Sequence, residues 1–155
     1  MYKLSVPVNN RMVRKVGKEA ILELLRKMGA GRVFLSINTY VTDRAERERE
    51  LSLLREHAGF FHENGLEAGV WLWTFTVGGE HDFTLMESLE GGLLPQKGCC
   101  PLDERFRQFA GEYLEDLAGT GVDIILFDDD YRYGFRDGMG CACERHLRKM
   151  GEILG

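Results

Sequence analysis

The sequence predicts an α/β protein made of four β-strand–α-helix units within a single domain that spans residues 1–155. Three observations support this fold class. Short apolar segments with the period of a strand alternate with segments that have the period of an amphipathic helix. Glycine residues stand where the first three helices are expected to end. The 155 residues are 44% hydrophobic and 29% charged, as is typical of one folded domain.

The first unit begins with a strand over residues 4–8, in which apolar residues alternate with others, and it stops at Asn9. A helix with apolar positions between residues 20 and 28 follows it. The second unit combines a strand over residues 33–38 with a helix that starts at a capping box, in which Asp43 precedes Glu46 by three residues.

The third unit has a strand over residues 68–75, a long loop over residues 77–101 and an amphipathic helix over residues 106–117. Loops of that length are usually functional or disordered. The fourth unit has a largely apolar strand over residues 122–127 and a helix from about residue 143 to residue 154.

Strict alternation predicts parallel strands joined by right-handed crossovers, and two architectures satisfy it. Half of a (β/α)8 TIM barrel would carry every helix on one face, whereas an open flavodoxin-like parallel sheet would carry helices on both. Ser5 and Ser36 lie mid-strand on the face that ends in Asn9 and Asn38, and small polar residues there suit a barrel interior below a polar site. We therefore expect a (β/α)4 half barrel.

A half barrel would leave two unpaired sheet edges and a bare apolar inner face in water. Something must cover both. We expect the chain either to form a homo-oligomer, at least a dimer, or to belong to a longer protein that supplies the missing C-terminal half of the barrel.

Composition excludes several classes of partner. A net charge of −5, with basic residues interleaved among acids, argues against nucleic acid. No apolar run approaches the roughly 20 residues of a membrane helix, and the N-terminus lacks the apolar core of a signal peptide, so we expect a cytoplasmic protein. Four cysteines in that compartment indicate thiols or metal ligands rather than disulfides. His57 and His62 fall within a predicted helix, where we expect surface positions.

Ligands of parallel α/β folds bind at the carboxyl ends of the strands, so the residues at those ends are candidates for substrate binding. They are Asn9, Asn38, Tyr40 and Trp73. Trp71 and Trp73 share one face of their strand, and aromatic rings at a strand end can stack on a sugar. Packing in the core is the alternative role for both tryptophans.

Three consecutive carboxylates, residues 128–130, close the fourth strand. Mutual repulsion at a partly buried strand end would raise the pKa of at least one, as a general acid near neutral pH requires. The same carboxylates could instead hold Mg²⁺, or one could cap a turn while the others face solvent.

The cysteines suggest a metal site. Cys141, Cys143 and His146 have the spacing Cys-x-Cys-x-x-His on a turn that leads into a helix, and a fourth thiolate from Cys99 or Cys100 would complete a tetrahedral zinc site. We take Cys100, next to a proline, as that fourth ligand. Four protein ligands leave no open position, so the zinc would be structural. Free thiols and a helical histidine are the alternative.

Residues 127–131 (Phe-Asp-Asp-Asp-Tyr), followed by Gly-Cys-Ala-Cys-Glu-Arg-His at residues 140–146, resemble the fourth-strand region of family 42 β-galactosidases and related glycoside hydrolases. In that family an Asp-Asn-Glu-Tyr run precedes a Cys-x-Cys-x-x-Cys zinc cluster. The resemblance carries motifs from about residue 99 onward, and it covers the remainder only as a β/α pattern.

The resemblance implies an N-terminal half, or a fragment, of a TIM-barrel glycosidase that acts on a carbohydrate. It places the acid/base residue at Asp130 and the preceding asparagine at Asp129, and it assigns no nucleophile to this chain. Aspartate replaces both family residues, and histidine replaces the last cysteine ligand. Two other functions remain open: a non-catalytic carbohydrate-binding or assembly module, and a Mg²⁺-dependent hydrolase on an open sheet.

Overall fold

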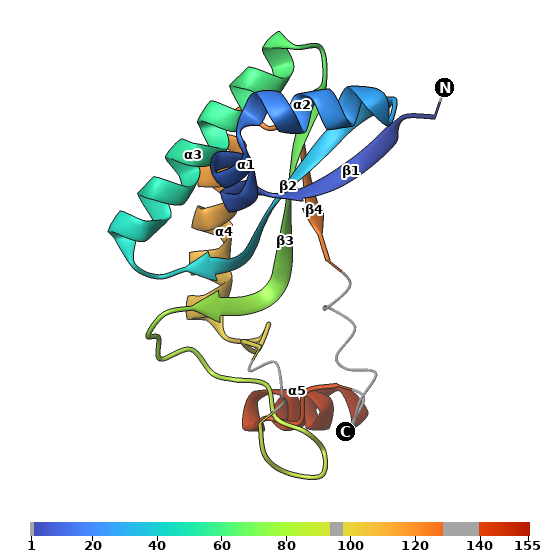
Figure 1. Ribbon diagram of the computed structural model, residues 1–155. Helices are drawn as coiled ribbons and strands as arrows, with labels where there is room; N and C mark the ends of the chain where they lie inside the picture. Colours follow the sequence, from blue (N-terminus) through green and yellow to red (C-terminus); the bar gives the residue numbers. More distant parts are fainter. Residues whose placement is uncertain (1, 94–97, 129–139) are drawn as a thin grey trace.

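The computed structural model describes residues 2–93, 98–128 and 140–155 (Figure 1). Within these residues, strands and helices alternate along the chain, which confirms the predicted α/β class. The elements are β1 (Leu4–Asn9), α1 (Asn10–Val16), α2 (Lys18–Lys27), β2 (Ala30–Val41), α3 (Arg44–Glu63), β3 (Glu67–Gly78), α4 (Glu104–Ala118), β4 (Ile124–Phe127) and α5 (Glu144–Leu154).

The strands form one open parallel sheet with the order β1-β2-β3-β4. Strands that are neighbours in the sequence are therefore neighbours in the sheet, and the order never reverses. A flavodoxin-like sheet has the order 2-1-3-4-5, in which the direction changes after the second strand. One row of paired residues crosses the sheet through Pro7, Phe34, Gly69 and Ile124.

Polar side chains begin three of the helices. The Asn9 side chain accepts a hydrogen bond from the Arg11 backbone N–H at 3.0 Å and starts α1. Asp43 accepts from the Glu46 N–H at 2.7 Å, so the helix start predicted there is confirmed. Asp103 starts α4 in the same way. Each such cap satisfies a helix N–H that would otherwise lack a partner and contributes about 1 kcal/mol.

Helices α1 to α4 pack on one face of the sheet (Figure 1). Val33 and Leu35 of β2 pair with Ala68 and Val70 of β3, and all four point to that face because alternate residues of a strand share a side. They belong to one buried apolar cluster with residues from each of these helices: Val13, Leu22, Leu25, Leu51, Leu54, Ala58, Phe61, Phe106, Tyr113 and Leu117.

The opposite face of the sheet carries the other set of alternating residues, and none of the helices in the described residues packs on it; we call it the uncovered face. It comprises Pro7, Phe34, Ser36, Trp71, Trp73, Ile124 and Leu126. Trp73 is 41% exposed and Leu126 is 39% exposed. Gly69 lies in the same row as Phe34, and a Cβ atom at Gly69 would stand 2.4 Å from the Phe34 ring, so glycine makes room for that ring.

The structure differs from the sequence-based expectation in the presence of α1 and in the lengths of β2 and β3. Helix α1 starts directly after β1, in a segment where no helix was predicted. Strands β2 and β3 also run further than expected, because pairing resumes at Tyr40↔Val77 after two register shifts. Asn38 and Tyr40 therefore lie within β2 rather than beyond its end.

Across the described ranges, no helix combines the length and apolar character needed to cross a membrane.

Candidate metal centre

Four side chains from two distant parts of the chain meet at one point. The potential ligand atoms of Cys100, Cys141, Cys143 and His146, which we call the metal cluster, all lie within 4.8 Å of one another. The Cys100 and Cys143 sulfurs are 3.5 Å apart, and His146 Nδ1 is 3.4 Å from each of them. The grouping predicted from the cysteine spacing is thus present.

Backbone hydrogen bonds hold the Cys100 side of the cluster in place. The Cys100 N–H donates to the Thr84 carbonyl at 2.7 Å, and the neighbouring Cys99 N–H donates to the Phe75 carbonyl, at the end of β3, at 2.8 Å. These two successive residues therefore point their side chains to opposite sides of the loop. The Cys99 thiol enters the main apolar core, whereas Cys100 joins the metal cluster.

Asp103 ties this loop to α4. Its carboxylate accepts hydrogen bonds from the Thr84 N–H at 2.7 Å and the Arg105 N–H at 3.0 Å, and its side chain is 1% exposed. Burial would raise the pKa of Asp103, but the hydrogen bonds from Thr84 and Arg105 outweigh burial and lower the pKa to about 2. The carboxylate is therefore ionised and holds the loop against the start of α4.

The other ligands come from the start of α5. The Ala142 N–H donates to the Glu87 carbonyl at 2.8 Å, which joins this segment to the loop that follows β3. Cys143 is the N-cap residue of α5, and His146 lies in its first turn, so the helix geometry sets the distance between these two ligands. Figure 1 shows α5 beside that loop, beyond the carboxyl ends of the strands.

Burial favours the neutral forms of Cys100, Cys141 and His146 when no cation is near. It raises the pKa of the Cys100 thiol to about 12 and also raises the pKa of Cys141, and it lowers the pKa of His146. The Leu102 N–H donates to the Cys100 sulfur at 3.4 Å, and the backbone N–H groups of Cys143 and Glu87 act on Cys141 in the same way. Such N–H···S bonds stabilise a thiolate once a metal ion has displaced the proton.

The donor set and its dimensions fit a metal ion such as zinc. A tetrahedral zinc ion has sulfur ligands at about 2.3 Å and nitrogen ligands at about 2.0–2.1 Å, which puts neighbouring donors about 3.6–3.8 Å apart. The observed separations of 3.4 and 3.5 Å are close to that spacing. Three sulfurs and one nitrogen fill a tetrahedron, so the site has the character of a structural site rather than a catalytic one.

The residues predicted to bind substrate do not all gather at one place. The Asn9 side chain caps α1, and Tyr40 is 1% exposed and packs edge-on against Phe106 and Tyr113 of α4. Asn38 pairs with Leu72 through its position in β2. Trp73 is the candidate that reaches the uncovered face with much of its ring exposed.

The acidic run that closes β4 is described only at its first residue. The Asp128 N–H donates to the Leu72 carbonyl at 2.9 Å, and the Asp128 carbonyl accepts from the Thr74 hydroxyl at 3.2 Å. Asp128 therefore lies beside Leu72 and Thr74 of β3, before that strand ends at Gly78. The predicted catalytic residues Asp129 and Asp130 lie outside the described residues.

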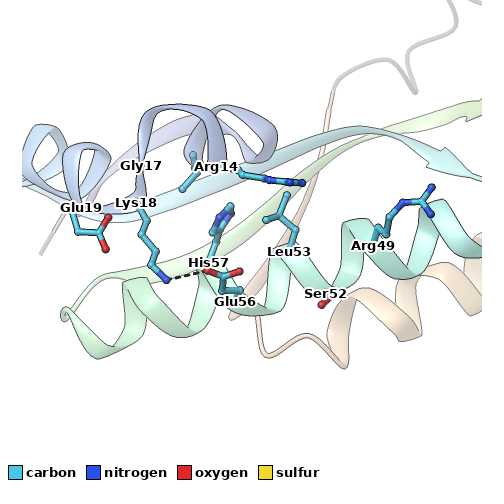
Figure 2. A pocket seen from close by; sticks show the side chains of 10 residues that line it. Arg14, Gly17, Lys18, Glu19, Arg49, Ser52, Leu53, Glu56 and His57 are labelled. Carbon is cyan, nitrogen blue, oxygen red and sulfur yellow. Dashed lines mark hydrogen bonds and ion pairs between the residues drawn. The ribbon is translucent and has the colours of Figure 1, made fainter.

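A buried polar pair lies away from these candidates, where the sequence did not indicate one. His57 was predicted at the surface, and this was wrong: it is 2% exposed, and its Nδ1 lies 2.7 Å from Asn10 Oδ1. Its ring borders a groove of about 590 Å³ between α3 and the α1–α2 segment, which Lys18 and Glu56 bridge with an ion pair of 2.9 Å (Figure 2). Burial lowers the pKa of His57, so its imidazole is neutral.

Comparison of the chain with models of known protein families finds no match, and comparison with curated proteins finds no match either.

Proposed function

We propose that this chain is the acid/base half of a TIM-barrel glycoside hydrolase, in which a structural zinc ion joins the loops that follow β3 and β4. The metal cluster is the observation that carries the proposal. Its ligands come from those two loops, as they do in the family 42 β-galactosidases that the motifs resemble. The zinc would fix the start of α5 against the loop that follows β3, near the edge of the sheet where barrel enzymes bind their substrates.

The arrangement of strands and helices supports the half barrel. In a (β/α)8 barrel the strands follow one another around the ring and the helices form an outer layer. The order β1-β2-β3-β4, with α1 to α4 on a single face, has this pattern. The uncovered face would become the barrel interior, for which Ser36 and the glycine at position 69 are small enough.

Asp130 would act as the general acid that protonates the glycosidic oxygen, and Asp129 would bind a sugar hydroxyl. A retaining glycosidase needs a second carboxylate about 5 Å away as the nucleophile. That carboxylate would come from the other half of the barrel. Trp73 at the rim would stack on the apolar face of the sugar ring, with Asn9, Asn38 and Tyr40 as the further candidates for substrate binding.

Hydrolysis of a panel of nitrophenyl glycosides by the zinc-loaded protein, with its barrel completed by the other half, tests the proposal. Asp130→Asn should lower kcat/KM by about 10²–10⁴, as expected for the loss of a general acid. Asp43→Asn is the matched control, because asparagine also caps a helix and α3 is retained. An unchanged rate of hydrolysis for Asp130→Asn in the completed barrel would contradict the assignment.

A non-catalytic carbohydrate-binding module is the second candidate, and the exposure of Trp73 favours it. In that case Trp73→Ala would abolish sugar binding measured by calorimetry, while Asp130→Asn would leave it unchanged. A Mg²⁺-dependent hydrolase would instead lose activity with a chelator and regain it with Mg²⁺.

A further inference from the structure

The two ends of the sheet are open in the described residues. Strand β1 pairs with β2 alone, and β4 pairs with β3 alone. Each end strand therefore has a row of backbone N–H and C=O groups directed outward along the sheet. In a parallel sheet the two edges differ from each other, so the β4 edge of one molecule can accept the β1 edge of another as it would accept a fifth strand.

Large exposed apolar side chains gather near these two ends. On the β1 side, Leu4 is 48% exposed and Leu24 of α2 is 53% exposed. On the β4 side, Leu126 and Phe127 are 39% and 40% exposed. Helix α5 has no buried residue, and it carries an apolar stripe of exposed side chains: Leu147, Met150, Ile153 and Leu154. Together with the uncovered face, these surfaces are too apolar to suit an isolated molecule in water.

We propose that a second copy of this chain closes the barrel, with β4 of each copy paired to β1 of the other around a two-fold axis. This inference rests on the proposed half barrel and names its partner. Four strands are half of the eight that a closed barrel of this kind contains. In a two-fold dimer the β4 edge of each copy pairs with the β1 edge of the other, so no strand edge is left without a partner.

The register of the new strand pair follows from the barrel geometry. An eight-stranded barrel of this type has a shear of eight, so each of two identical halves contributes about four residues of offset. The observed row that links Pro7 to Ile124 therefore continues to Lys3 of the second copy, and Leu126 lies opposite Ser5 of the second copy. Because the offset is even, Ser5 and Leu126 both face the barrel interior.

Charge does not oppose this pairing. Lys3 is the residue that would meet the row of Ile124, and its ammonium already pairs with Glu67 at the amino end of the strands. Near the β1 edge, Leu24 and Met28 of α2 are also apolar and half exposed, so the second copy would meet no charged side chain at these two positions.

Disulfide trapping tests the register. Ser5→Cys protein mixed with Leu126→Cys protein, both zinc-loaded, should give a disulfide-linked dimer on a non-reducing gel, and neither variant alone should do so. Pro7→Cys with Leu126→Cys is the matched control, because it lies on the same face but about 6.6 Å further along the strand, and it should link far less. Equal linkage by the control pair, or no linkage by the predicted pair, would overturn the register.

The mass of the unmodified protein tests the partner. Light scattering should give twice the 17.7 kDa of the chain at micromolar concentration. A folded monomer would overturn the inference, and so would a monomer that binds anionic phospholipid vesicles through the basic, amphipathic α5. A monomer that binds one zinc ion would contradict the dimer but not the metal site. A protein that binds no zinc would contradict the proposed function, whatever its oligomeric state.

Discussion

Replacing one metal ligand should release α5 while leaving the rest of the protein folded. The perturbation is Cys141→Ser, which removes one of four ligands. Structural zinc binding is worth about 10–16 kcal/mol in small zinc proteins, or about 2.5–4 kcal/mol for each ligand, so the variant should bind zinc about 10²–10³-fold more weakly. Because α5 has no buried residue, its 11 residues depend on the cluster rather than on the apolar core.

Zinc competition with a chromophoric chelator measures the affinity, and hydrogen exchange measures the release of α5. In the variant, the amides of α5 should lose protection, while those of β2 and β3 keep it. Cys99→Ala is the matched control, because that thiol is buried in the apolar core and should affect stability without changing zinc affinity. Unchanged zinc affinity in Cys141→Ser, or equal loss in Cys99→Ala, would refute the assignment of ligands.

Three further predictions concern the scaffold. The pKa of His57 is lowered in the folded protein, so as the pH drops the unfolded chain binds a proton at this imidazole before the folded chain does. The free energy of unfolding should therefore fall as the pH drops through about 6.5. Chemical denaturation should show this pH dependence in His62→Gln but not in His57→Gln. Asp103→Ala should lower the free energy of unfolding by about 2–4 kcal/mol, because it removes a helix cap and leaves the Thr84 N–H without its acceptor. A change below about 0.5 kcal/mol, which is typical of substitutions at surface sites, would contradict this role of Asp103. Gly69→Ala should lower the free energy of unfolding by about 1–3 kcal/mol, because the added Cβ would clash with the Phe34 ring. Gly111→Ala, on an open helix surface, should leave stability unchanged or raise it. Equal shifts in melting temperature for the two variants would contradict this packing.

The order of strands and helices could be predicted because each segment has a clear period and the helices end at glycine or begin at a capping aspartate. The metal cluster could be predicted because Cys141, Cys143 and His146 are close in the sequence. The choice of Cys100 over Cys99 depends on the two backbone hydrogen bonds that set which side of the loop each residue faces. Sequence spacing alone carries no such information.

Other features depend on contacts between distant segments. Tyr40 was expected at a strand end, but β2 continues past it because pairing with β3 resumes and the ring packs against α4. His57 lies on a polar helix, and its burial depends on Asn10 of a helix that the sequence did not predict. A buried polar pair of this kind leaves no pattern in either segment when each is considered by itself.

X-ray absorption at the zinc edge of the zinc-loaded protein tests the metal centre most directly. Three sulfur ligands at about 2.3 Å and one nitrogen ligand at about 2.0–2.1 Å, with one zinc ion bound per chain, are the expected result. Four sulfur ligands, or a shell dominated by oxygen, would contradict a centre built from Cys100, Cys141, Cys143 and His146.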